Sequence, residues 1–374
     1  MIIVHIVEPF AAGIAVFVRS LTEVMPDDVH IIIHGERRNV MTAAEVKKNF
    51  PKQNVRFLKW RFAQRSIDPI KDFFALTELY TILRRLRRKN LVDAVHLHSS
   101  KSGLLGRAAC KMAGIQNVFY TPNGASFLGT RNGFKRFMYK QFEKIGNRIG
   151  GKVICCSASE LHEYVKLGIQ AVYINNGVEL NRENKALPKR IDNKFRIVTS
   201  GRIEAQKNPI LFNAIADYFD DMDQIEFVWI GDGKDKKLFT AKNIVVTGWL
   251  NTANDVRDYM MNSDVYLSTS NYEGLSFAVL EALSLKKPVL LSNCTGNRDL
   301  VKGGINGGLF NSSADAINKI LMYYNNREML SLMGVFSESI CRKEFDVKEN
   351  FRGYRELYAG SIVCAERPLP WSFS

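Results

Sequence analysis

Short apolar runs rich in β-branched residues alternate along the chain with stretches in which apolar side chains recur every three or four positions. In the first half, these runs occupy residues 2–7, 29–34, 94–98, 117–121, 152–157 and 171–175. Runs of this length are typical of buried strands, and the stretches between them are typical of helices that pack one face on a core. Strands that alternate with helices predict a parallel sheet with crossover helices.

The pattern breaks at residues 181–194, a polar, proline-containing stretch that has neither period and is typical of an interdomain linker. It resumes with apolar runs at residues 195–201, 225–233, 243–249, 264–270 and 288–293. A length of 374 residues also exceeds what one hydrophobic core usually organises. The sequence therefore predicts two α/β domains, each doubly wound and Rossmann-like, with ligands at the carboxyl ends of the strands.

Apolar side chains also recur at helical spacing between the second and third runs. They are Ile70, Phe73, Phe74, Leu83 and Leu86. We expect this helix to turn all five toward the core of the first domain.

Basic residues concentrate in the first half of the chain. Residues 1–190 hold 31 Lys and Arg against 15 Asp and Glu, whereas residues 191–374 hold 21 against 23. Such a one-sided charge favours a polyanionic partner. Residues 134–148 combine apolar positions at helical spacing with lysines and arginines, which suits a helix lying on an anionic membrane and equally a helix packed on the sheet. Nucleic acid is disfavoured because the basic cluster at 84–89 lacks interleaved aromatic residues.

The sequence predicts a protein of the cytoplasm, where its basic first half would suit a peripheral position on the inner face of the cell membrane. No stretch approaches the roughly 18 apolar residues that a membrane span needs, and the opening ten residues lack the basic start of a signal peptide. The six cysteines form no CxxC pair and have no histidine near them at zinc-ligand spacing. We expect them to be buried free thiols.

The strongest chemical signal is the segment SNYEGLSFAVLEAL at residues 270–283, which predicts a strand end, a glycine turn and a helix capped by Ser276. A helix N-terminus offers unpaired N–H groups to a diphosphate. Glu273 in the turn and Glu281 in the helix can edge one pocket, where carboxylates accept hydrogen bonds from sugar hydroxyls. Taken alone, both glutamates could equally be solvated.

A second loop, GRIEAQKNP at residues 201–209, supplies cations after a strand. Arg202 offers a fork for phosphate oxygens, and Lys207 offers a mobile point charge, which together can neutralise a leaving diphosphate without a metal. Gly231 and Gly233 form a tight turn that lets backbone approach a nucleotide, although such turns often only reverse the chain.

In this order, these segments resemble the second domain of the large group of retaining GT-B glycosyltransferases called family four. The matching segments are GRIEAQKN, IGDG, VTGW, SDVYLSTSNYEGLSFAVLEAL, PVLLSNCTGNRDLV and NGGLF. The resemblance implies that Glu281 holds the ribose hydroxyls and Glu273 the donor sugar, while Arg202 and Lys207 grip the diphosphate. It further implies a donor site lined by Gly274, Leu275, Ser276, Gly231, Gly233 and Trp249.

The first half resembles the acceptor domain of the same group more loosely. Gly13 stands in what resembles the group's glycine loop, where Ala12 replaces a second glycine. HLHSSKSGLLGRAA at 96–109 and YTPNGASF at 120–127 resemble segments that line the cleft. Asn123 occupies a position that is usually histidine and that helps to orient the donor sugar. This departure favours a different sugar, or a weakened or inactive enzyme.

The resemblance also divides the chain. It implies an acceptor domain at residues 1–185, a nucleotide-sugar domain at 186–345, and a C-terminal segment, 346–374, whose helix crosses back to the first domain, with the two domains facing across a cleft. The alternative for that helix is a surface cap on the second domain.

Two further patterns suit metal ions weakly. Asp221 and Asp223 form an Asp-x-Asp, but they precede a strand, away from the ligand edge. His96 and His98 point to one face of a strand, yet have no third ligand nearby in the sequence. We expect no metal and no cofactor.

The chemistry implied by the resemblance is hexosyl transfer by front-face attack, with retention, from a nucleotide sugar, UDP before GDP, to a glycan or polyprenyl-linked acceptor in bacterial surface polysaccharide synthesis. The enzyme would act by positioning and by stabilising the departing diphosphate. Two alternatives stay open: a nucleotide-sugar epimerase on the same fold, and a catalytically silent partner subunit, which Asn123 motivates.

Overall fold

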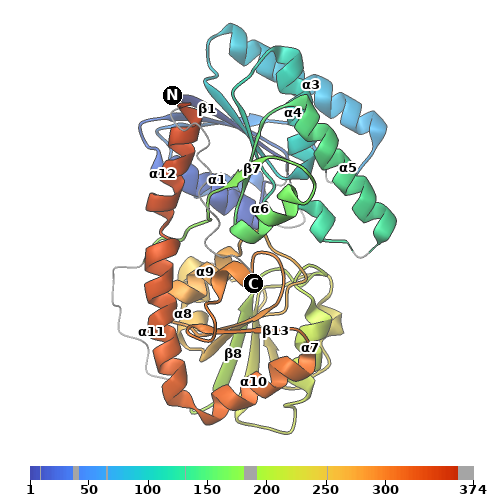
Figure 1. Ribbon diagram of the computed structural model, residues 1–374. Helices are drawn as coiled ribbons and strands as arrows, with labels where there is room; N and C mark the ends of the chain where they lie inside the picture. Colours follow the sequence, from blue (N-terminus) through green and yellow to red (C-terminus); the bar gives the residue numbers. More distant parts are fainter. Residues whose placement is uncertain are drawn as a thin grey trace. The chain divides into compact units, whose positions relative to one another are not determined.

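The computed structural model describes residues 1–8, 10–36, 42–64, 66–130, 132–180, 192–250 and 252–360. It divides the chain into two compact units (Figure 1). Unit 1 holds Met1–Asn176 and the segment that begins at Val347, and unit 2 holds Gly177–Asp346. The boundary that we predicted between residues 185 and 186, and most of the predicted linker, lie outside the described residues.

Unit 1 is built on a seven-stranded sheet of order β3-β2-β1-β4-β5-β6-β7, in which neighbouring strands are parallel. The strands are β1 (Ile2–Val7), β2 (Val29–His34), β3 (Val55–Lys59), β4 (Ala94–His98), β5 (Val118–Thr121), β6 (Lys152–Cys155) and β7 (Ala171–Tyr173). Six of them match predicted runs. We missed β3 because this edge strand carries basic residues at two of its five positions.

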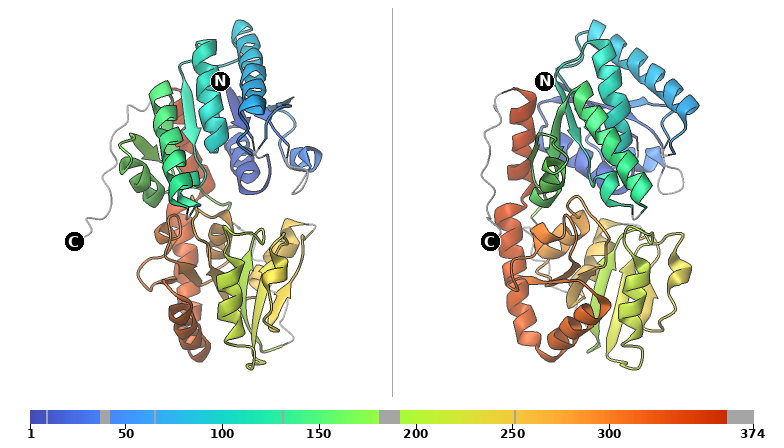
Figure 2. Two further views of the ribbon diagram at one scale, coloured as in Figure 1. Left: turned by 90° about the vertical axis from the view of Figure 1, so that its right-hand side faces the viewer. Right: turned by 45° about the vertical axis from the view of Figure 1, so that its right-hand side comes forward.

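Helices cover both faces of this sheet (Figure 2). In one layer, α3 (Pro69–Arg88), α4 (Ser100–Ala113) and α5 (Gly133–Ile149) pack side by side, and α1 (Ala12–Val24) and α12 (Val347–Tyr358) pack together in the other. Alternate residues of β1 and β4 point to the two layers, because successive side chains of a strand face opposite sides. Val4 and Leu97 thus join the core under α3 and α4, whereas His96 lies against Tyr354 of α12. The shorter helices are α2 (Ala43–Lys48), η1 (Ser126–Leu128) and α6 (Ala158–Val165).

The predicted burial of apolar side chains was wrong for the first half of α3. Leu83 and Leu86 are buried as expected, but Ile70, Phe73 and Phe74 are 72%, 61% and 48% exposed. The core is instead filled by the face that carries Ala75 and Leu79. The five predicted positions do not lie on one face of a helix with 3.6 residues per turn, because the row from Ile70 to Phe74 is rotated away from the row that ends at Leu86.

Helix α5 coincides with the predicted basic amphipathic segment. It buries only Glu143 and Gly146, while Phe134 and Phe137 in its first turns are 73% and 56% exposed. The alternative in which the whole apolar face packs on the sheet is therefore wrong for the first turns. The helix leaves aromatic side chains among its lysines and arginines at the surface.

Unit 2 is built on a six-stranded sheet of order β10-β9-β8-β11-β12-β13, again with parallel neighbours. The strands are β8 (Phe195–Ser200), β9 (Ile225–Ile230), β10 (Ile244–Val246), β11 (Val265–Ser268), β12 (Val289–Ser292) and β13 (Gly307–Phe310). The helices are α7 (Pro209–Asp217), η2 (Lys236–Leu238), α8 (Ala253–Met261), α9 (Phe277–Ser284), η3 (Arg298–Leu300), α10 (Ser313–Asn325) and α11 (Arg327–Glu344). Two parallel Rossmann-like sheets confirm the predicted fold class. In the described residues, no helix is both long and apolar enough to cross a membrane.

Candidate active site

The candidate donor site of unit 2 centres on an ion pair between two predicted residues that are 66 positions apart. Lys207 Nζ lies 2.8 Å from Glu273 Oε1, with side chains 19% and 9% exposed. Ser270 Oγ donates to the same oxygen at 2.7 Å, and Gln206 Nε2 donates to Oε2 at 3.4 Å. Burial by itself would lower the pKa of the Lys207 ammonium, but the Glu273 carboxylate keeps it above its usual value. The Lys207 ammonium is therefore charged at neutral pH.

Backbone contacts fix the loop that carries Glu273. Glu273 N donates to Thr295 O at 3.0 Å, so the loop after β11 is joined to the loop after β12. A Cβ on Gly296 would lie 2.8 Å from the carbonyl oxygens of Glu273 and Gly274, which explains why the second loop needs glycine there. Ser276 ends this loop as the N-cap residue of α9, as predicted, although its side chain makes no capping hydrogen bond. Leu275 is buried, and Glu281 lies half-buried in α9.

Arg202 does not join the ion pair between Lys207 and Glu273. Its guanidinium lies 2.8 Å from Glu204, in the same loop after β8. Both predicted phosphate-binding cations thus have carboxylate partners. A diphosphate would have to exchange with Glu204 and Glu273 to bind them.

The predicted glycines after β9 have a structural role. A Cβ on Gly231 would lie 2.3 Å from Gly201 O, and one on Gly233 would lie 2.3 Å from Ile203 O. The two glycines therefore let the turn after β9 pack against the loop that carries Arg202. Trp249, in the loop after β10, is 55% exposed, so its ring is free of the core.

In unit 1, the two departures from the group's pattern both have left-handed backbones. Ala12 has φ +51° and Asn123 has φ +55°, a conformation that costs most residues energy and that asparagine tolerates better than most. Gly13 follows Ala12 in the first turn of α1. Asn123 Nδ2 donates to Thr121 O at 3.3 Å, and its Oδ1 accepts from the Cys156 thiol at 3.5 Å. Local backbone geometry thus gives a reason for asparagine at position 123.

A buried glutamate that the sequence reasoning missed holds the Asn123 loop. Glu160 Oε1 accepts hydrogen bonds from Gly124 N at 2.9 Å and Ala125 N at 3.0 Å, while Oε2 accepts from Cys156 N at 2.8 Å. Burial raises the pKa of Glu160 to about 7, although the three N–H donors favour its charged form. Its position at the start of a helix after a strand was the available signal, because glutamate there commonly contacts backbone N–H groups.

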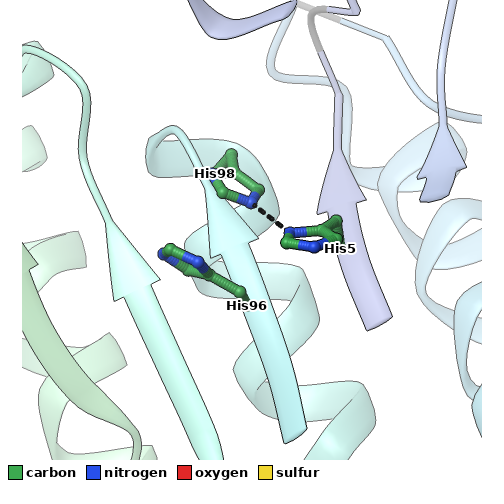
Figure 3. A group of neighbouring side chains, drawn as sticks. All are labelled: His5, His96 and His98. Atoms are coloured by element: carbon green, nitrogen blue, oxygen red, sulfur yellow. Dashed lines mark hydrogen bonds between the residues drawn. The ribbon is translucent and has the colours of Figure 1, made fainter. Parts of the chain in front are cut away.

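Three histidines form the group of described residues that could hold a metal ion (Figure 3). His5 joins the predicted pair His96 and His98 because β1 lies beside β4, with His5 opposite His96. The sequence analysis missed His5 because the pairing of β1 with β4 cannot be read from the sequence. All three imidazoles are buried, and burial lowers each pKa well below its usual value.

The hydrogen bonds around these rings determine their tautomers. Met25 O can only accept, so His30 Nε2 carries a hydrogen, and neutral His30 then accepts at Nδ1 from His5 Nε2 at 3.0 Å. His5 must in turn accept at Nδ1 from His98 Nε2 at 3.1 Å, which leaves the buried Nδ1 of His98 with a lone pair and no hydrogen-bond partner among the described residues. Tyr358 and Thr121 occupy both nitrogens of His96. A metal ion would have to displace these hydrogen bonds, which link the imidazoles of His5, His30 and His98 into a relay of neutral rings.

The other predicted metal pattern lies elsewhere. Asp221 and Asp223 are exposed and lie just before the amino end of β9, at the sheet edge opposite the loops described above. Their position offers no enclosed coordination site.

Comparisons with known proteins agree on one family. Residues 11–182 match the family described as Glycosyltransferase Family 4, and residues 194–326 match the one described as Glycosyl transferases group 1. A UDP-Gal:alpha-D-GlcNAc-diphosphoundecaprenol alpha-1,3-galactosyltransferase of Escherichia coli is 30% identical over 330 residues, which cover 80% of this chain and 82% of that protein.

More distant relatives share the fold or part of the length. The N,N'-diacetylbacillosaminyl-diphospho-undecaprenol alpha-1,3-N-acetylgalactosaminyltransferase of Campylobacter jejuni is 22% identical and covers 68% of this chain and 72% of its own length. Among solved structures, Anabaena HepE in complex with UDP is similar with a TM-score of 0.72 at 16% identity, over 96% of this chain and 100% of that one. At that identity the likeness concerns the fold.

Proposed function

The chain belongs to glycosyltransferase family 4 and is a glycosyltransferase, and on that premise we propose that it transfers a hexose from a UDP-sugar to a hydroxyl of a lipid-linked glycan with retention of configuration. The Lys207–Glu273 pair beside the N-terminus of α9 carries the proposal, because it places a cation and a carboxylate at the carboxyl edge of a parallel sheet. The names of the Escherichia coli and Campylobacter jejuni relatives specify diphosphoundecaprenol acceptors, and that of the former specifies UDP-Gal.

Each predicted donor-site residue of unit 2 would bind a different part of the nucleotide sugar. Glu281 accepts hydrogen bonds from the ribose, and Glu273 from the sugar, while Arg202 and Lys207 leave their carboxylate partners to bind the diphosphate. The N–H groups at the start of α9, together with Gly274 and Leu275, face the developing negative charge. An oxygen of the leaving diphosphate takes the proton of the attacking hydroxyl, so no protein nucleophile is required.

A lipid-linked acceptor would also require unit 1 to lie against a membrane. A polyprenyl diphosphate resides in the bilayer, and α5 presents Phe134 and Phe137 among the exposed cations Lys135 and Arg136. Each basic residue near an anionic surface adds roughly 1 kcal/mol of attraction that salt screens. The protein would then work as a peripheral protein on the inner face of the cell membrane.

A transfer assay with a panel of radiolabelled UDP- and GDP-sugars, polyprenyl-linked acceptors and EDTA tests the function. We expect transfer from a UDP-sugar that persists in EDTA, since Arg202, Lys207 and the start of α9 replace a divalent ion. Release of an altered nucleotide sugar without acceptor would show an epimerase instead. Nucleotide binding without any turnover would show a silent subunit, the reading that Asn123 motivated. Transfer that EDTA abolishes and manganese restores would refute the metal-free site.

The stereochemistry has its own readout. Proton NMR of the first product formed should show the anomeric configuration of the donor. Inverted product would refute the front-face mechanism while leaving the donor site in place.

A further inference from the structure

Five large apolar side chains crowd the surface at the start of α3 and in the loop before it. We call them the α3 apolar patch: Phe62, Ile67, Ile70, Phe73 and Phe74, which are 48% to 72% exposed. The rings of Phe62 and Phe74 lie 5.6 Å apart, and those of Phe73 and Phe74 lie 6.0 Å apart. Single exposed apolar residues need no explanation, but a contiguous group of them marks an interaction surface.

Among the described residues, the patch takes no part in the core of unit 1. Helix α3 fills the core with a different face, and Trp60, directly before the patch, is buried and bonded through its indole N–H to Ala75 O at 2.9 Å. The outward side of the helix changes character along its length, from the apolar patch at its start to exposed arginines at its end, among them Arg84, Arg85 and Arg88. Apolar exposure is thus confined to one end of the helix.

That end lies at the edge of the sheet where the strands have their carboxyl ends. Crossover helices run antiparallel to the strands they connect, so α3, α4 and α5 all begin at this edge. Lys101, at the start of α4, connects α4 to the start of α3. Its Nζ lies 2.5 Å from Asp72 of α3 and also donates to Ser66 O in the loop before α3. The patch therefore adjoins the loop after β4. Helix α5, which carries the exposed Phe134 and Phe137 in its first turns, begins at the same edge and packs on α4.

We propose that the α3 apolar patch inserts into the interface of an anionic lipid bilayer and so sets unit 1 against the membrane that holds the acceptor. The inference rests on the proposed function and names the contact that it requires. The exposed cations Arg61 and Lys71 are neighbours of the patch residues in the sequence, and the exposed Lys135 and Arg136 lie in the first turn of α5, which begins at the same edge of the sheet. A surface that combines inserted aromatic side chains with neighbouring cations matches the apolar interior and the anionic headgroups of a bilayer.

Co-sedimentation of the full chain with vesicles tests the insertion. The vesicles are phosphatidylcholine with phosphatidylglycerol, or phosphatidylcholine alone, and the variant combines Phe73→Ser with Phe74→Ser. We expect its partition to the anionic vesicles to fall at least about tenfold, since each phenylalanine ring that moves from water into the bilayer contributes strongly to the free energy of binding. Leu332→Ser with Phe336→Ser is the matched control, because these residues of α11 in unit 2 are 63% and 47% exposed. The control variant should partition like the wild type.

A second measurement keeps the inference testable if the serine variant folds poorly. A solvent-sensitive fluorophore on Ile70→Cys should shift to the blue on the anionic vesicles and be quenched by lipids labelled in their acyl chains. A label that stays in water, or serine variants with unchanged partition, would overturn the insertion. Sedimentation of the protein without lipid provides another refuting outcome: a dimer that the Phe73 and Phe74 changes dissociate would assign the patch to a second copy.

UDP affinity separates this inference from the proposed function. The patch variants should bind UDP as the wild type does, because the donor residues lie in unit 2. If the wild type binds UDP and transfers sugar while the patch changes leave partition intact, only the insertion fails. If the wild type neither binds UDP nor transfers sugar, the proposed function fails.

Discussion

Replacing Glu273 by glutamine should destabilise unit 2 and nearly abolish transfer while leaving nucleotide affinity almost unchanged. Glu273 and Lys207 are 2.8 Å apart, and both side chains are largely buried. Breaking a fully buried pair typically costs 3–5 kcal/mol, because the remaining charge is left without a partner. Ser270 and Gln206 can still bond to a glutamine, and Lys207 keeps some access to water, so we expect a loss of about 2–3 kcal/mol.

A double-mutant cycle isolates this interaction. Lys207→Met should cost about as much as Glu273→Gln, and the double variant should cost little more than either one, which gives a coupling of roughly 2 kcal/mol. Urea unfolding, followed by tryptophan fluorescence, measures each free energy of unfolding. Lys236 and Asp232 supply the matched control, because they lie 3.8 Å apart with side chains 50% and 35% exposed. Their coupling should stay below about 1 kcal/mol.

The same variants test the chemical roles. Glu273→Gln should lower the transfer rate by roughly a hundredfold or more, as the loss of a group that acts on the reacting sugar does. Its UDP dissociation constant, measured by calorimetry, should change by less than a few fold. Additive free energies in the cycle would refute the ion pair, and wild-type turnover by Glu273→Gln would refute the role of Glu273.

Three further predictions concern other parts of the chain. Glu281→Ala should weaken UDP binding by about 1.5–3 kcal/mol, since a carboxylate that accepts two ribose hydroxyls makes charged hydrogen bonds; unchanged affinity in calorimetry would contradict the ribose contact. Ala12→Gly should raise the free energy of unfolding by about 0.5–1 kcal/mol, because residue 12 has φ +51°; a decrease in urea unfolding would contradict that backbone. Unit 1 should lose stability as the pH falls below about 6.5, by up to about 1.4 kcal/mol per pH unit for each of His5, His96 and His98. Burial lowers their folded pKa values, so the unfolded chain binds the extra protons; melting temperatures equal at pH 7.5 and 5.5 would show that the rings are not buried neutral.

Glu160 opposes the histidines in that pH dependence. Its folded pKa of about 7 exceeds that of an unfolded glutamate, so the stability that its proton uptake contributes is present at acidic pH and is lost as the pH rises through 7. Burial likewise raises the pKa of Glu143 and lowers the pKa values of His30 and His34. Five imidazoles then oppose two carboxyls in unit 1, so the net effect of acid should remain destabilising.

The sequence by itself determined the fold class and most of the strands, because periodicity is a local property of the chain. The runs at 2–7, 29–34 and 94–98 coincide with β1, β2 and β4, since continuous apolar segments are what a sheet covered on both faces requires. The order of segments from Gly201 to Phe310 likewise contained the resemblance to the family that the comparisons established. The roles of individual donor-site residues remain predictions.

The tertiary structure alone decided which side chains meet. Lys207 faces Glu273 because β8 and β11 are neighbours in the sheet, and His5 reaches His98 because β1 lies beside β4. Spacing along the chain also failed at α3, where helical recurrence assigned Ile70 and Phe73 to the core and the structure leaves them exposed. The physical reason is the same in each case: a period gives the faces of an element, but only packing against distant segments selects which face is buried and which charges become partners.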